Sequence, residues 1–153
     1  MQPQEQANWC WAAVSASVAQ FYSAVTSWLQ QCDVASAELS KVCCPVGSNV
    51  DCDVLWYLDR ALARVGHFNT WRSGTATIAE TRNEIDNNRP LGARIGWSSG
   101  GGHFVVISGY STSAAGDFVT IDDPIYARST LLMSNFQSAY QGRGSWTHTY
   151  WTN

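Results

Sequence analysis

Positive charge is scarce in this chain of 153 residues. Lysine occurs once, at Lys41, no run of basic residues is present, and the formal net charge is -3. Nucleic acids and anionic membranes are bound through clustered positive charge, so we expect neither of them as a partner.

Long apolar runs are also missing. No stretch approaches the roughly 18 apolar residues that a membrane-spanning helix requires, and the N-terminus is polar, unlike a signal peptide. Hydrophobic residues nevertheless make up 45% of the chain, and eight residues are tryptophan. A chain of this length and composition can bury a core of its own, so we expect a single domain over residues 1–153 that acts as a monomer.

Cysteine pairs of the C-x-x-C type, which four-thiolate zinc sites normally use, do not occur. Instead, Cys32, Cys43, Cys44 and Cys52 lie in one segment, which favours two disulfides and an exported protein. Adjacent cysteines rarely bond to each other, so Cys43 and Cys44 are each expected to reach one of the other two, in a pairing that stays open. We expect this segment to stabilise the fold rather than to recognise a substrate, and Cys10 to remain free.

The first half of the chain has helical periodicity and capping signals. Four helices are predicted: residues 8 to about 28, a short helix after Asp33, about 53–66, and one that starts at 77 and ends near 90. Asn8 is expected to cap the first helix, which places Cys10 in its first turn. The sequence TIAE, residues 77–80, has the capping-box pattern of a helix start.

Beyond Pro90 the pattern changes to short β-rich segments separated by glycine, serine, aspartate and proline. Strands are predicted at residues 90–97, 103–110, 118–122, 127–133 and 145–152, with one or two helical turns at 134–140. A helical part over about residues 1–89, followed by antiparallel strands over about 90–153, makes an α+β fold.

The surroundings of Cys10, in QEQANWCWAA, favour a reactive thiol. A thiol at a helix N-terminus faces the positive end of the helix dipole, which favours the thiolate. A thiolate nucleophile also needs an imidazole beside it and a third group that orients the imidazole. His67 follows a helix end and His148 lies inside a late strand, whereas His103 follows a glycine-rich turn and begins the most apolar strand. We therefore predict that His103 is the partner of Cys10.

The orienting group is expected on the next strand, FVTIDDP, whose end returns level with His103. Strand alternation places Asp123 on the face of Ile121 and Asp122 on the opposite face. An aspartate before proline is also common in turns. We expect one of the two aspartates to orient His103 and the other to face the turn or solvent.

Taken together, these motifs resemble those of the papain-like cysteine proteases. QEQANWCWAA, GGGHFVVISGY and VTIDDP occur in the order and spacing of that family, and the resemblance extends over essentially the whole chain. It is strongest to a small bacterial branch that includes effector proteases delivered into plant cells and is similar to bacteriocin-processing peptidases. The resemblance implies a papain-like fold, with the nucleophile in the helical half and the histidine in the β half.

Position by position, the resemblance implies that Cys10 is the nucleophile, His103 its imidazole partner and Asp123 the orienting residue. Gln4 corresponds to the glutamine that donates to the oxyanion, a role that suits a neutral amide donor already in place. Gln6 is a nearer rival that the sequence does not exclude. The implied reaction is attack of a thiolate on a peptide carbonyl, an acyl-enzyme, and release by water, with no metal and no cofactor.

The resulting hypothesis is a secreted bacterial cysteine endopeptidase that acts on a protein or peptide substrate, with delivery into a host or competitor cell as a further expectation. A papain-fold deamidase or acyltransferase would use the same triad, because specificity lies in pockets that the motifs do not describe. A non-catalytic binding module is a third interpretation. The intact set of cysteine, histidine, aspartate and glutamine argues against it.

Overall fold

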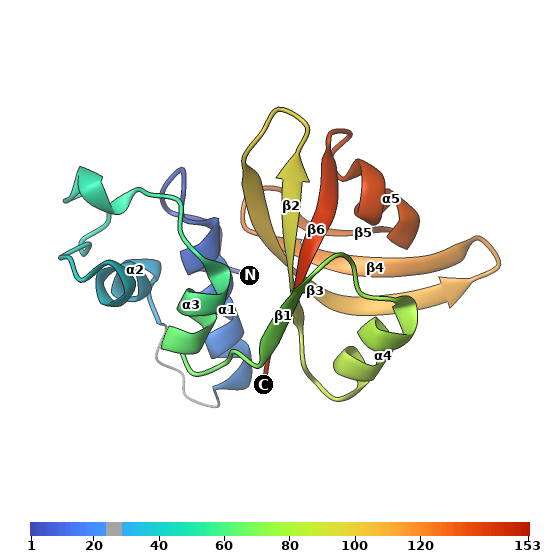
Figure 1. The fold of residues 1–153 in the computed structure, drawn as a ribbon. Helices are drawn as coiled ribbons and strands as arrows, with labels where there is room; N and C mark the ends of the chain where they lie inside the picture. Colours follow the sequence, from blue (N-terminus) through green and yellow to red (C-terminus); the bar gives the residue numbers. More distant parts are fainter. Residues whose placement is uncertain (24–28) are drawn as a thin grey trace.

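Six helical segments and six strands follow one another along the described chain, residues 1–23 and 29–153 of this computed structural model. The helical segments are α1 (Cys10–Tyr22), α2 (Gln31–Leu39), the 3-10 helix η1 (Val50–Cys52), α3 (Leu58–Arg64), α4 (Ile78–Asp86) and α5 (Met133–Ala139). The strands are β1 (Thr70–Ser73), β2 (Leu91–Trp97), β3 (Gly102–Ser113), β4 (Gly116–Asp123), β5 (Ala127–Leu132) and β6 (Gly144–Trp151). They form one antiparallel sheet in the order β1-β6-β2-β3-β4-β5 (Figure 1).

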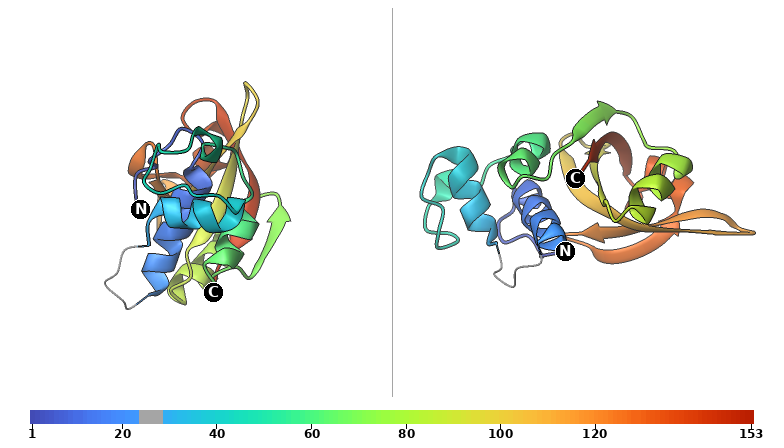
Figure 2. Two further views of the ribbon diagram at one scale, coloured as in Figure 1. Left: turned by 90° about the vertical axis from the view of Figure 1, so that its left-hand side faces the viewer. Right: turned by 90° about the horizontal axis from the view of Figure 1, so that it is seen from below.

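Helices α1, α2 and α3 form a layer beside the sheet, whereas α4 and α5 pack onto the sheet itself (Figures 1 and 2). The predicted α+β division into a helical part and a β part is therefore confirmed. Within the described ranges, no helix is both long enough and apolar enough to span a membrane.

Helix α1 lies between the two parts and contacts α2, α3 and β3. It is buried on nearly all sides, and its small side chains let the neighbouring elements come close; they are Ala12, Ala13, Ala16 and Ala19. Toward the sheet, Val14 and Val18 pack with Val106 of β3. The helix that begins with Cys10 is thus fixed against the strand that begins near His103.

The core of the sheet comes from the alternating buried positions of its central strands, packed under α5. These residues are Leu91, Ala93, Ile95, Val105, Ile107, Val119 and Ile121, together with Met133 and Phe136 of α5. Strands β3 and β4 pair with Val106 opposite Asp122. This register brings the end of β4 level with the start of β3, as the sequence predicts.

The first helix begins one residue later than predicted, and Asn8 is not its cap. The N-cap residue is Trp9, whose indole has no acceptor and makes no side-chain capping bond. Asn8 is hydrogen-bonded to Asp53 through its backbone and side-chain N–H groups. The helix ends at Tyr22, and Ser23 is extended. The predicted end near Trp28 falls on residues outside the described ranges.

Of the other predicted elements, one helix start is confirmed, one helix begins later than predicted, and one strand has no counterpart among the predictions. The capping box is confirmed, since Thr77 Oγ1 accepts from Glu80 N at 3.1 Å and Glu80 Oε2 accepts from Thr77 N at 2.7 Å. Helix α3 starts at Leu58 rather than near residue 53. Strand β1 was not predicted, because all four of its residues are exposed and its sequence has no apolar alternation.

Candidate active site

Cys10 is the first residue of α1 and the free cysteine of the described chain. It is 6% exposed, so its thiol lies just below the surface where the two parts meet. The first N–H groups of a helix have no partner inside the helix. The backbone at Cys10 therefore presents the thiol beside donors that are available to an anion.

His103 lies at the start of β3 and is 3% exposed. Its Nε2 atom is 2.9 Å from Oδ1 of Asp123, and the Cys10 side chain is close enough to the ring to help raise its pKa. Since Nε2 faces the carboxylate, Nδ1 is the ring nitrogen left for the thiol. The structure thus brings Cys10, His103 and Asp123 together from α1, β3 and β4.

The Asp123 carboxylate is buried and held on both oxygens. Besides His103, Oδ1 accepts from the backbone N–H groups of Ile125 at 2.6 Å and Tyr126 at 2.9 Å. The Oδ2 atom accepts from the phenol of Tyr140 at 2.7 Å. A carboxylate held in this way has a fixed orientation toward the imidazole, which is what an orienting residue requires.

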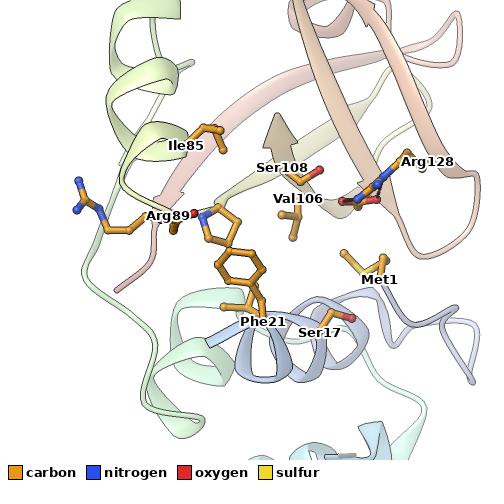
Figure 3. Close-up of a pocket in the computed structure, with 12 residues that line it drawn as sticks. Met1, Ser17, Phe21, Ile85, Arg89, Val106, Ser108 and Arg128 are labelled. Carbon is orange, nitrogen blue, oxygen red and sulfur yellow. Dashed lines mark hydrogen bonds and ion pairs between the residues drawn. The ribbon is translucent and has the colours of Figure 1, made fainter. Parts of the chain in front are cut away.

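Asp122 points to the opposite side of β4. Its carboxylate accepts from Arg128, with Nε 2.7 Å from Oδ1 and Nη2 2.9 Å from Oδ2. It lines a cavity of about 300 Å³ between α1 and the sheet, where Phe21, Val106 and Ser108 also contribute (Figure 3). Neither Cys10, His103 nor Asp123 lines this cavity. The strand alternation predicted from the sequence therefore separates the two aspartates, and only Asp123 reaches the imidazole.

The charged groups of the site shift one another's proton affinities. Burial lowers the pKa of His103, but its hydrogen bond with Asp123 and its interaction with Cys10 outweigh burial and raise that pKa from 6.5 to about 9. Burial raises the pKa of Asp123, yet the bond from His103 and two backbone N–H groups hold it below its ordinary value. Burial and the Asp123 carboxylate raise the pKa of Tyr140, so its phenol keeps the proton that it donates. The site therefore favours an imidazolium beside a carboxylate.

Trp97 of β2 completes the wall behind the imidazole. Its ring stacks on His103, with centroids 5.9 Å apart, and on Tyr140 at 6.4 Å. A Cβ atom on Gly144 would lie 2.7 Å from Cζ3 of Trp97, so this position needs glycine. Trp97 and Tyr140 were not predicted as site residues. No local motif marks them, because their positions depend on how β2 and α5 pack beside β3 and β4.

Gln4 lies close to the helix start, but its amide is engaged. Its Nε2 donates to the backbone oxygens of Gln6 at 2.9 Å and Ala7 at 2.8 Å, while Oε1 is buried without a partner. Its backbone N–H donates to Pro124 O at 3.0 Å, next to Asp123. The rival Gln6 extends its amide toward Gly47 of the cysteine-rich segment. Of the two glutamines, Gln4 is the one whose backbone is bonded to the turn after β4.

The other two histidines lie elsewhere. His67 stacks on Tyr22 at 4.5 Å, and its Nδ1 is 2.6 Å from the backbone oxygen of Asn153. His148 is on β6 and lies beside Trp71 of β1, and burial lowers the pKa of His148. Neither contact involves Cys10.

The two predicted disulfides are present, and the structure decides their pairing as Cys32–Cys44 and Cys43–Cys52. Among the described residues, the cluster with metal-ligand spacing is Cys32, Asp33 and Cys44. Its two sulfurs are bonded to each other, so neither is a thiolate, the form in which cysteine binds a metal.

We compared the sequence of this chain with models of known protein families. The family model described as papain-like cysteine protease AvrRpt2 matches residues 1–141. The chain belongs to this family. Membership in the AvrRpt2 family agrees with the helical half, the six-stranded antiparallel sheet and the papain-like fold that the sequence motifs imply. A comparison with curated protein sequences gave no match.

Proposed function

We propose that the protein hydrolyses peptide bonds, with Cys10 as the nucleophile, His103 as its acid–base partner and Asp123 as the orienting carboxylate. The observation that carries this proposal is the buried His103 ring, whose Nε2 is 2.9 Å from Asp123 Oδ1 and whose pKa is raised by both Asp123 and the Cys10 side chain at the start of α1. Membership in a cysteine protease family supports the same chemistry.

In the proposed reaction, the Cys10 thiolate attacks the carbonyl carbon of the scissile bond, and the His103 imidazolium gives a proton to the leaving amine. The product is an acyl-enzyme. Water then attacks the acyl carbon while His103 takes the proton from the water, and the thiolate leaves. Asp123 stabilises the imidazolium in both steps without taking its proton.

The oxyanion that forms in each step needs donors that are already in place. The N–H group at the start of α1 supplies one. We assign the second to Gln4, whose Nε2 would turn from the carbonyl of Gln6 or Ala7 toward the substrate oxygen.

We further propose that the protein acts outside the cell that makes it, as a secreted endopeptidase of the effector type, and as a monomer on protein or peptide substrates. The two disulfides support export, because such bonds persist in oxidising compartments.

The test is labelling with an epoxysuccinyl inhibitor of thiol proteases, followed by mapping of the modified residue and by a peptide-hydrolysis assay. An adduct on Cys10 together with peptide cleavage is expected, and Cys10→Ala is expected to lose both while it keeps the wild-type circular dichroism spectrum. Absence of an adduct on Cys10 at neutral pH would refute the assignment. Side-chain deamidation without peptide cleavage would identify a different acyl-transfer activity of the same triad.

A further inference from the structure

Two tryptophans on either side of the nucleophile donate hydrogen bonds to the cysteine-rich part of the chain. Trp9 Nε1 is 2.7 Å from Cys52 O, and Trp11 Nε1 is 2.9 Å from Val54 O. Both indole rings are buried, with 1% and 0% exposure. A buried indole N–H is costly to leave without an acceptor, so these contacts fix the backbone of residues 52–54 against the start of α1.

Asp53 lies between the two acceptors in the chain and contacts Asn8, the residue before the N-cap of α1. The backbone N–H of Asn8 donates to Asp53 Oδ1 at 2.8 Å, and Asn8 Nδ2 donates to Asp53 O at 3.1 Å. The N-cap residue Trp9 has no side-chain capping bond of its own. The carboxylate of Asp53 therefore fixes, from 45 residues away, the backbone of the residue before this N-cap.

The segment of residues 52–54 is itself held by the two disulfides. Cys52 ends the short helix η1 and is bonded to Cys43, whose backbone N–H donates to Ser36 Oγ of α2 at 3.0 Å. The next residue, Cys44, is bonded to Cys32 of α2. A continuous path thus runs from α2 through both disulfides to the residues that contact the start of α1.

We propose that Asp53 is a positioning residue for the nucleophile, and that the Cys43–Cys52 disulfide keeps Asp53 in the place where it acts. The kinetic part of this inference rests on the proposed peptidase function. Asp53 acts through Asn8 and Trp9 on the position of the Cys10 thiol relative to His103. The cysteine-rich segment then contributes to the site itself, beyond the stabilising role expected from its sequence.

The first test compares Asp53→Ala, Asp53→Asn and Asp51→Asn in kcat, KM and the rate at which iodoacetamide alkylates Cys10. Asp53→Ala is expected to lower kcat and the alkylation rate about tenfold with KM little changed, since small displacements of reacting groups are costly. Asp53→Asn keeps an oxygen acceptor for the Asn8 N–H and is expected to retain most of both rates. Asp51 is exposed and is the matched control, expected to match the wild type.

A purely structural role for Asp53 would lower the melting temperature of Asp53→Ala and leave kcat and alkylation of the folded protein unchanged, and that result would overturn the proposal. If Asp53→Ala does not fold, Asp53→Glu shifts the acceptor without deleting it, and unchanged rates in that variant would overturn the proposal equally. Alkylation needs no peptide hydrolysis. A wild type that cleaves no peptide therefore refutes the proposed function and leaves the test of Asp53 intact.

The second test compares two disulfide deletions, Cys43→Ser/Cys52→Ser and Cys32→Ser/Cys44→Ser. The first frees residues 52–54 and is expected to slow alkylation of Cys10 more than the second, which leaves the bond to Cys52 in place. Circular dichroism at the assay temperature establishes that both variants are folded. Equal alkylation rates in the two variants would overturn the role assigned to Cys43–Cys52.

Discussion

Tyr140 and Asp123 are joined by a buried hydrogen bond in which the phenol donates to Oδ2 at 2.7 Å. Three other donors contact Oδ1, so the phenol is the contact that stops the carboxylate from turning about its own axis. Tyr140 follows α5 and stacks on Trp97, which stacks on His103. The orientation of the imidazole therefore depends on an element, α5, that contains none of Cys10, His103 and Asp123.

Tyr140→Phe removes this hydrogen bond and keeps the ring. We expect kcat/KM to fall on the order of tenfold, as for the loss of a bond to a charged group. A carboxylate with one donor fewer is more basic and attracts the His103 proton more strongly. The alkaline limb of the pH–activity profile is therefore expected to move to higher pH. The control is Tyr110→Phe, which removes a phenol that is bonded to Asp86 elsewhere on β3. An unchanged profile in Tyr140→Phe would show that the phenol does not act on the imidazole.

The two neighbouring aspartates are expected to differ sharply. Asp123→Ala leaves His103 without its buried partner, and we expect kcat/KM to fall on the order of 100-fold or more. Asp122→Ala breaks the pair with Arg128 on the other face of β4 and is expected to lower the melting temperature while kcat/KM stays close to wild type. Steady-state kinetics and thermal unfolding of both variants provide the check. The reverse order of kinetic effects would assign the orienting role to Asp122.

The pH dependence follows from His103, whose pKa is raised from 6.5 to about 9. The proposed reaction needs the imidazolium, so activity is expected to decline as pH rises through about 9. Because the folded-state pKa lies above the unfolded one, the protonated ring contributes stability that is fully present below pH 6.5. That stability is lost as pH rises toward 9. Activity profiles and melting temperatures across this range test both statements, and an alkaline limb near pH 7 would contradict them. Asp123→Asn is expected to move the limb to lower pH.

The thiol inventory separates Cys10 from the other cysteines. Alkylation in denaturant without reductant, followed by intact-mass measurement, is expected to modify one cysteine, since the other four are in disulfides. After reduction, all five cysteines are expected to react. Digestion of the unreduced protein should release peptides linked as Cys32–Cys44 and Cys43–Cys52. Five reactive thiols before reduction would contradict the disulfides and remove the main support for export.

Local signals in the sequence predicted a large part of the fold. The capping box at Thr77 and Glu80 acts within one helical turn and is confirmed, and Gly66, with φ +83°, ends α3 as expected. Predictions were wrong where a distant residue competes with the local signal. Asn8 has the side chain of an N-cap, but Asp53 binds it. The exposed strand β1 depends on pairing with β6 and has no pattern of its own.

For the candidate site, the choice of Asp123 over Asp122 came from the resemblance to papain-like cysteine proteases. Short-range patterns were sufficient to select Cys10 at a helix start, His103 at the beginning of an apolar strand, and two aspartates on opposite faces of β4. Those selections use periods of two and 3.6 residues, which any segment carries in its own sequence. Tertiary structure alone decided the disulfide pairing, the bond from Tyr140 to Asp123 and the contact of Asp53 with Asn8. The last two join residues 17 and 45 positions apart, and no local period encodes such contacts. They form only when packing of α5 against the sheet and of the cysteine-rich segment against α1 brings donor and acceptor within hydrogen-bonding distance.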